Sequence, residues 1–291
     1  MAKIIKSYVK QHPALLEKYL SVRKKYLAVR NLTLKFFMVP FDLFLKVLLF
    51  FCPPVLTKFN DFIIINSVLD KTNLYQESLN SRLPKFLKLH YLYFSRFNRG
   101  FGEPVFYLMW YEIFCFFKPK RILEIGVYRG KTLSLFSVLA KLVNSELNYE
   151  IHGVSPFDST RDSTWEYEKI DYLSDCKKNM NFFDCNNYHF HKCLSTDSAA
   201  EEIIRGGKWD IIYIDGSHDF EVVKLDFENA LMGLVSGGVL ILDDSSLYLP
   251  HEQDSQRFWG WPGPSRVANE LARDRMRYLG LVSHNNIFLK S

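Results

Sequence analysis

The chain from Arg121 to its last residues alternates short apolar segments with longer amphipathic ones. These segments predict strands at 121–125, 149–154, 187–193, 210–214, 238–242, 276–282 and 285–290, with helices near 131–142, 164–179, 197–205, 220–233 and 265–274. Strands that alternate with helices form βαβ units, in which the strands run parallel. The predicted fold is therefore α/β, with a mainly parallel sheet of seven strands and helices on both faces.

The part of the chain that precedes this alternation differs from it in charge. Residues 1–60 carry 11 Lys and Arg against two acidic residues, a net charge of +9, whereas the rest of the chain has a net charge of −4. An apolar stripe at steps of three and four residues predicts an amphipathic helix at 13–30. We therefore predict a basic, helical N-terminal extension at 1–103 and a second domain at 104–291, which begins with a helix at 105–117.

The most apolar stretch of the extension, residues 36–56, contains two charged residues and three prolines. It therefore lacks the roughly 20 uninterrupted apolar residues of a membrane span. If residues 41–51 form a helix, one side of it is apolar and carries Phe44, Leu45, Leu48 and Phe51. Two interpretations stay open. Either this helix lies in a membrane interface, where the basic residues attract anionic lipid, or it packs on the second domain or on a second copy of the chain.

Cysteine content and the N-terminal pattern bear on the location of the protein. The five cysteines are odd in number and have no ligand-like spacing, which is typical of a protein in the reducing cytoplasm. The first residues show no compact apolar core with a cleavage site, so no secretory signal is predicted. The sequence pI is about 8.8, yet the basic excess lies on helices with apolar stripes, and no nucleic-acid motif occurs. We expect a cytoplasmic protein, peripheral at the membrane under the interfacial interpretation, that binds no nucleic acid.

A glycine-containing loop follows the first predicted strand. Gly126 and Gly130 allow a sharp turn between this strand and the next helix, and the amides at the helix N-terminus would face a carboxylate or phosphate. The spacing is GxxxG and so departs from the GxGxxG dinucleotide pattern. A loop of this kind indicates either a ligand site or only a structural turn.

With Glu124 two residues before the first glycine, this loop resembles motif I of class I S-adenosylmethionine-dependent methyltransferases. The resemblance implies a Rossmann-like sheet, S-adenosylmethionine as cofactor, and a loop whose backbone lines the methionine part. It also implies an acidic residue after the second strand, which would hold the ribose hydroxyls. Ser155 stands there instead, so either Ser155 makes one contact or Asp158 replaces the carboxylate. The expected cofactor-binding residues are Glu124, Gly126, Gly130, Thr132, Ser155, Asp158, Ser195 and Asp215.

Three aspartates follow two further predicted strands. Asp215 ends one strand, and Asp243 and Asp244 end the next, so neighbouring strands would bring three carboxylates to one edge of the sheet. Their charges repel one another unless a cation is bound, and oxygen ligands suit Mg²⁺, Mn²⁺ or Ca²⁺. His218, three residues after Asp215, could accept a proton from a hydroxyl beside the metal. Each of these residues is, taken alone, also typical of a helix cap or a loop.

The segment from Tyr213 to Phe220, together with the Gly-Gly and Asp-Asp pairs that follow, resembles a narrower group. This group comprises metal-dependent O-methyltransferases that act on sugars of macrolide and aminocoumarin antibiotics, with the related cephamycin-type enzymes. The resemblance implies Asp215, Asp243 and Asp244 as ligands of a divalent metal, with Mg²⁺ expected from the oxygen donors. It also implies His218 as general base, with Asp215 beside it in the catalytic site, and a sugar or glycoconjugate as acceptor. The resemblance covers residues 104–291.

Other functions remain open at this stage. Catechol-type O-methyltransferases typically use Asp, Asp and Asn, so the Asp243-Asp244 pair favours the sugar group over methylation of a small catechol or diol. A third interpretation is a non-catalytic cofactor-binding scaffold, which the presence of both Asp215 and His218 disfavours. The loop 247–264 is rich in aromatic residues, Gly and Pro, and is either an acceptor-binding lid or a surface loop anchored by its tryptophans. Assembly into a homo-oligomer is also left open.

Overall fold

The computed structural model describes residues 37–52, 63–65, 68–97, 99–144, 148–158, 171–248 and 258–291. The chain divides into two compact units, residues 1–53 and 54–291. The first unit contributes one described helix, at 37–51, which contains the helix predicted at 41–51. The helix predicted at 13–30 lies outside the described residues, and the domain boundary at 103/104 stays a prediction. No helix in the described ranges is long and apolar enough to cross a bilayer.

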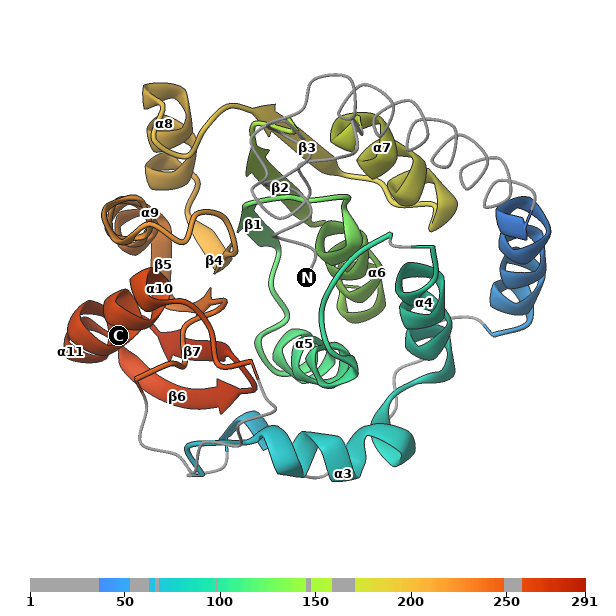
Figure 1. The fold of residues 1–291 in the computed structure, drawn as a ribbon, viewed down its shortest axis with the longest axis horizontal. Helices are drawn as coiled ribbons and strands as arrows, with labels where there is room; N and C mark the ends of the chain where they lie inside the picture. Colours follow the sequence, from blue (N-terminus) through green and yellow to red (C-terminus); the bar gives the residue numbers. More distant parts are fainter. Residues whose placement is uncertain are drawn as a thin grey trace, which may run out of the picture. The chain divides into compact units, whose positions relative to one another are not determined.

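The second unit is built on one sheet, whose seven strands among the described residues have the order β3-β2-β1-β4-β5-β7-β6 (Figure 1). Strands β1 to β5 run parallel, and β7 runs antiparallel to both β5 and β6. This arrangement confirms the predicted α/β fold. The strands are β1 (Arg121–Ile125), β2 (Glu150–Ser155), β3 (Tyr188–Lys192), β4 (Trp209–Ile214), β5 (Leu234–Leu242), β6 (Arg277–Val282) and β7 (Asn285–Leu289).

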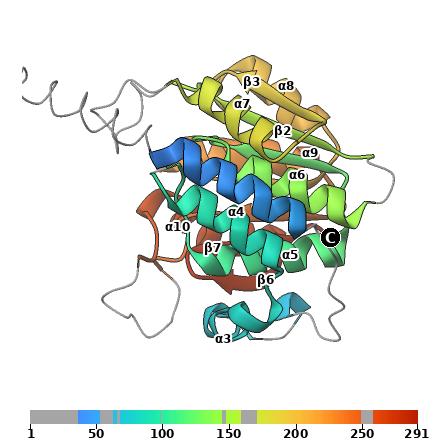
Figure 2. The same ribbon diagram turned by 90° about the vertical axis from the view of Figure 1, so that its right-hand side faces the viewer.

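Helices cover both faces of the sheet (Figures 1 and 2). Side chains alternate along each strand, so Ile122 points to the core beneath α5, α6 and α7, and its neighbour Leu123 points to the core beneath α8, α9 and α10. Burial on both faces explains why β4 is a nearly continuous apolar run. The helices are α3 (Thr72–Arg82), α4 (Lys85–Ser95), α5 (Pro104–Phe117), α6 (Lys131–Val143), α7 (Tyr172–Phe182), α8 (Ser198–Gly206), α9 (Phe220–Gly233), α10 (Pro262–Val267) and α11 (Arg273–Arg275), with a 3-10 turn η1 (Ile63–Ile65) and a π-helical turn η3 (Ala268–Ala272).

Two predicted elements differ most from the structure in their bounds. The helix predicted at 164–179 is observed as α7, which begins only at Tyr172, because the Asp171 side chain accepts a hydrogen bond from the Ser174 amide and caps the helix there. Residues 159–170 lie outside the described residues. Strand β5 begins at Leu234, four residues before its predicted start. A register shift opposite Trp209 lets the strand continue through Gly237 and Gly238.

The strand directions determine which loops meet. Ile125, Ile214 and Leu242 pair side by side near the ends of β1, β4 and β5, so the loops after these three strands leave from the same edge. Because β7 is antiparallel, its first residues lie at that edge too, with Asn286 opposite Leu242. The turn between β6 and β7 therefore reaches the same edge as the three loops.

A buried carboxylate joins α5 to the residues that precede it. Glu112 is fully buried, and its Oε2 accepts hydrogen bonds from the Ile63 amide at 2.8 Å and the Tyr75 hydroxyl at 2.9 Å. Its Oε1 lies 2.9 Å from Arg82 Nη2. Burial raises the pKa of Glu112, and the charge of Arg82 opposes this rise. The segment before the sheet is thus held to α5 by polar contacts as well as by packing.

Replacing Glu112 with alanine should cost about 3–5 kcal/mol of stability, because Arg82 and the Tyr75 hydroxyl would lose their buried partner. The free energy of unfolding, measured by urea denaturation, checks this. The control is Glu77→Ala, on the exposed side of α3, which should change stability by less than about 0.5 kcal/mol. Equal effects of the two substitutions would show that Glu112 is not an anchor.

Candidate functional site

The loop between β1 and α6 lies directly against the residue that ends β4. Gly126 has φ +100°, and a Cβ added there would lie 2.1 Å from the carbonyl oxygen of Asp215. The Gly126 amide donates to Val154 O at 2.9 Å, and the Asp215 amide donates to Ile125 O at 2.8 Å. Only glycine fits this position, because both the backbone angle and the space exclude a side chain. The loop thereby leaves its backbone close to the ends of β2 and β4.

Glu124, in β1, is a buried carboxylate beside this loop. The residue is 3% exposed, the Thr132 side chain hydrogen-bonds to it, and its Oε2 is buried without a hydrogen-bond partner. Burial raises its pKa to about 8, and the nearby charge of Asp243 adds to the rise. A buried acceptor without a partner is costly unless a ligand supplies a donor. Glu124 therefore fits the role of binding a cofactor with hydroxyl or amino groups.

The two candidates for the ribose contact are placed differently. The Ser155 hydroxyl is buried and donates to Val127 O at 2.9 Å, so it joins the loop after β2 to the loop after β1. Asp158 is half-buried and lies just before the residues that the structure leaves undescribed. Ser195, after β3, lies near the carboxyl of Asp226 in α9. The Ser155 hydroxyl thus already has a partner within the protein.

The three aspartates meet at the ends of β4 and β5, as the sequence predicted from strand order. Asp215 and Asp243 share a side-chain hydrogen bond. Burial raises the pKa of both, and for Asp215 the charges of Asp243 and Asp244 add to the rise. Asp243 Oδ1 is buried and has no hydrogen-bond partner. A bound cation would relieve both the repulsion and the missing contact, so these residues fit a metal site.

His218 stands at the outer side of this group. Its Nε2 lies 3.1 Å from Asp244 Oδ2, and its side chain is 39% exposed. The ring of Trp261 stacks on it, with centroids 5.2 Å apart and planes 18° apart. The imidazole is thus held between a carboxylate and an aromatic face while it stays open to solvent. This arrangement permits His218 to take a proton from a bound ligand.

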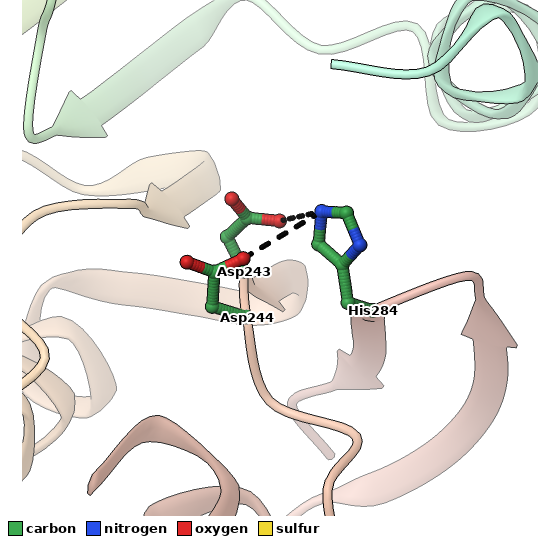
Figure 3. A group of neighbouring side chains, drawn as sticks. All are labelled: Asp243, Asp244 and His284. Carbon is green, nitrogen blue, oxygen red and sulfur yellow. Dashed lines mark ion pairs between the residues drawn. The ribbon is translucent and has the colours of Figure 1, made fainter. Parts of the chain in front are cut away.

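The sequence analysis did not identify His284 as a site residue. This histidine lies in the turn between β6 and β7, and its Nε2 is 3.4 Å from Asp243 Oδ1 and 3.6 Å from Asp244 Oδ1 (Figure 3). Asp243, Asp244 and His284 offer ligand atoms that all lie within 4.8 Å of one another. A histidine in a hairpin turn has no local pattern that indicates a site. Its role depends on the antiparallel strand β7, which brings the turn to the edge of the sheet.

Lys131, the first residue of α6, was also not identified. Its Nζ donates to Phe101 O and, at 3.3 Å, to Gly102 O. Burial lowers the pKa of Lys131 to about 7, while the charges of Asp215 and Asp243 oppose this effect. The lysine therefore connects the residues before α5 to the candidate site. Its side chain also places a basic group near the aspartates.

Comparison with known proteins assigns a family to this arrangement. Residues 123–245 match a family described as methyltransferase domain. This part of the chain is a methyltransferase domain. The match extends from β1 to the residue after Asp244, so it includes the Gly126 loop and all three aspartates. It confirms the sequence prediction of a methyltransferase with the class I fold. A comparison with curated proteins gives no match.

Solved structures show the same fold at low sequence identity. An O-methyltransferase from Bacillus cereus, in complex with SAH, is 16% identical, with a TM-score of 0.51 over 75% of this chain and 98% of its own. The SAH-bound methyltransferase PaMTH1 from Podospora anserina is 16% identical, with a TM-score of 0.50 over 81% of this chain and 98% of its own. MycE of the mycinamycin pathway, in complex with Mg and SAH, is 20% identical, and the alignment covers 72% of this chain and 56% of MycE. Its TM-score is 0.45. At these identities the likeness shows the fold alone.

The described part of the predicted lid packs onto the edge of the methyltransferase domain. Gly260 forms a β-bridge with Ser245, and the Trp261 amide donates to Asp244 O at 2.8 Å. Trp259 is buried, whereas Trp261 is 44% exposed. Trp259 is therefore an anchor, and Trp261 presents an aromatic face beside His218. Residues 249–257 of this loop lie outside the described residues.

The raised pKa of Glu124 gives the domain a pH-dependent stability. The pKa of Glu124 is about 8 in the folded protein and 4.5 for an ordinary glutamate. Between pH 4.5 and pH 8 the folded protein keeps this proton while the unfolded chain has lost it. The free energy of unfolding therefore falls as pH rises through this range. Glu124→Gln should remove this loss. We expect the free energy of unfolding of the cofactor-free variant, relative to wild type, to increase from pH 5 to pH 8.5. For Glu77→Gln, at an exposed position, the difference from wild type in the free energy of unfolding should stay constant over this pH range. A constant difference for Glu124→Gln as well would contradict the raised pKa.

Proposed function

We propose that this chain is a metal-dependent O-methyltransferase that transfers a methyl group from S-adenosylmethionine to a hydroxyl of a sugar or glycoconjugate. The observation that carries the proposal is the juxtaposition of the Gly126 loop with Asp215 and Asp243 at one edge of the sheet. The loop suits a cofactor, and the paired buried carboxylates suit a cation. The two would then lie next to each other, as transfer of a methyl group to a chelated hydroxyl requires.

The cofactor would be held mainly by the first loop. Glu124 offers a buried carboxylate oxygen without a partner, and Gly126 leaves room for a ligand next to the backbone. The complexes of the Bacillus and Podospora proteins with SAH support this choice of cofactor. The ribose hydroxyls would donate to Asp158 or to the Ser155 oxygen, which can still accept a hydrogen bond while its proton is donated to Val127 O. S-adenosylmethionine supplies the electrophilic methyl group on its sulfonium.

Asp215, Asp243 and Asp244 would hold the divalent ion, which is Mg²⁺ if only these oxygen ligands bind it. When bound, the ion lowers the pKa of an acceptor hydroxyl and orients it. A bound cation would favour the ionised form of the aspartates despite their raised pKa values, and the aspartates would define where the acceptor oxygen lies. Asp215 also abuts the Gly126 loop through its own backbone, so it joins the two halves of the site.

His218 would act as the general base. Its Nε2 lies beside Asp244 Oδ2, so a proton taken up at this nitrogen would be stabilised by the carboxylate. Stacking on Trp261 limits rotation of the ring. Trp261 and Phe258 are both exposed, with their rings at 66° to each other, and offer aromatic contacts next to the base, which suit the ring of a sugar. A small catechol or diol would meet the same surface, so it remains the alternative acceptor.

Asp243→Asn should separate cofactor binding from turnover. The variant loses a charged ligand next to the acceptor, so we expect S-adenosylmethionine affinity within about threefold of wild type and metal-dependent turnover lowered roughly 100-fold or more. Calorimetry measures the affinity. Release of S-adenosylhomocysteine, with panels of sugar-bearing and catechol acceptors, measures turnover.

Asp274→Asn is the matched control, because this aspartate is exposed and lies in α11, away from the site. It should leave both quantities unchanged. Turnover by the wild type that is the same with and without a chelator would contradict the metal-dependent reaction. Failure of the wild type to bind S-adenosylmethionine would contradict the proposed function. Binding without turnover of any acceptor would favour the cofactor-binding scaffold interpretation.

We also propose that the helix at 37–51 places the enzyme at an anionic membrane surface. Seven large apolar side chains of this helix are exposed, while residues 1–60 carry a net charge of +9. Exposed apolar side chains next to basic residues are typical of helices that lie in the interface. The exposed side chains are Phe37, Val39, Leu43, Phe44, Val47, Phe50 and Phe51. A second copy of the chain, as in a homo-oligomer, is the other candidate to cover them.

Vesicle sedimentation tests this location. We expect the full chain to bind vesicles that contain phosphatidylserine and not vesicles of phosphatidylcholine alone. Phe50→Ser with Phe51→Ser should weaken binding about tenfold or more, because each inserted phenylalanine contributes roughly 1.5–3 kcal/mol. Leu225→Ser, on the exposed side of α9, is the control. A dimer that forms without lipid and dissociates in the double variant would assign this face to a second copy instead.

A further inference from the structure

We propose that His284 Nε2 is a direct ligand of the metal ion, and that this nitrogen makes the site bind Mn²⁺ or Co²⁺ in preference to Mg²⁺. The inference rests on the proposed function, because it concerns the same site. It adds a ligand from the turn between β6 and β7, whereas the three aspartates follow β4 and β5. It also changes the class of ion that the site would select.

The positions of the three groups are those of metal ligands. His284 Nε2 lies 3.4 Å from Asp243 Oδ1 and 3.6 Å from Asp244 Oδ1, and the side chains point toward one another (Figure 3). Neighbouring ligands in an octahedral site with bonds of ~2.1 Å lie roughly 3 Å apart. A small contraction would therefore allow all three atoms to bind one ion. Asp243 Oδ1, which has no hydrogen-bond partner, would gain one ligand bond.

The backbone and packing hold His284 at this position. The Ser245 amide donates to His284 O at 2.9 Å, so the turn between β6 and β7 is tied to the loop that follows the two aspartates. The rings of Phe106 and Phe258 pack edge-on against the imidazole, with centroids 4.9 and 5.3 Å away. The residue is 9% exposed. A ligand held in this way requires little ordering when an ion binds.

The other ring nitrogen has a partner that favours one tautomer. His284 Nδ1 lies 3.4 Å from Ser283 Oγ, and Ser283 Oγ donates to Glu103 Oε1 at 3.1 Å. Because the serine proton is used toward Glu103, its oxygen can accept the Nδ1 proton. Nε2 then carries a lone pair that faces two carboxylates. Metal-binding histidines typically have such a partner on the opposite nitrogen.

A lone pair that faces two carboxylate oxygens is repulsive unless a cation lies between them. Two cations can fill this role, and they have different consequences. A proton on Nε2 would make His284 a counter-ion of the aspartates and would leave the ion to oxygen ligands. A metal bound to Nε2 would have mixed oxygen and nitrogen ligands, which first-row transition ions accept more readily than Mg²⁺ does.

Metal binding to the chelator-stripped full chain separates these two cases. Calorimetry with Co²⁺ and with Mg²⁺ is carried out on wild type, His284→Gln and His189→Gln, the last as an exposed control in β3. We expect His284→Gln to weaken Co²⁺ binding at least tenfold and Mg²⁺ binding less than threefold, with no change in the control. Pulsed electron paramagnetic resonance of bound Mn²⁺ should show a directly coordinated nitrogen in wild type. This signal should disappear in His284→Gln.

The contrary outcomes are distinct. Unchanged Co²⁺ affinity in His284→Gln, or tighter binding of both ions, would make His284 a counter-ion and overturn the inference. A nitrogen signal that persists in His284→Gln and disappears in His218→Gln would assign the ligand to His218 and also overturn it. Failure of the wild type to bind any of the three ions would overturn both this inference and the metal-dependent part of the proposed function. If the variant does not fold, absence of a coordinated nitrogen from the wild-type spectrum would by itself overturn the inference.

Discussion

The close approach of the β1–α6 loop to the end of β4 is the constraint on which the candidate site depends. With Gly126 at φ +100° and its Cα against the Asp215 carbonyl, the two loops share one small space. This contact leaves no room for a side chain, so the backbone itself forms the wall that a ligand would meet. It also places the first aspartate of the cluster beside the cofactor loop, which is why two binding functions can lie at one edge of the sheet.

Burial of acidic groups is the second determinant of the site. Glu124, Asp215 and Asp243 all have raised pKa values, chiefly because burial penalises their charged forms. A protein that used these carboxylates only for its own stability would pair them with internal donors, as it does for Glu112 with Tyr75 and Arg82. Oxygens of Glu124 and Asp243 instead lack hydrogen-bond partners. The difference is clearest between Glu112, whose Oε2 accepts hydrogen bonds from the Ile63 amide and the Tyr75 hydroxyl, and Glu124, whose Oε2 accepts none among the described residues. It favours a ligand-binding role for Glu124 and a structural role for Glu112.

Different parts of the site were predictable to different degrees. Gly126 and the three aspartates could be found from the sequence, because each follows an apolar strand and parallel strands end at a common edge. His218 could be found from its distance to Asp215 along the chain. His284 and Lys131 could not, since no local pattern distinguishes a histidine in a hairpin turn or a lysine at a helix start. Their positions depend on contacts with residues far away in the sequence, such as Ser245 and Phe101.

The sequence by itself determined the strands, the helices between them and the residues at the strand ends, because hydrophobic periodicity and glycine positions act locally. It therefore determined the α/β class and the position of the glycine loop after β1. Only the tertiary structure decided that β7 runs antiparallel beside β5 and brings His284 to the aspartates. It also decided that the Ser155 hydroxyl is used by Val127. Side-chain contacts of this kind depend on packing between distant segments, which no local pattern encodes.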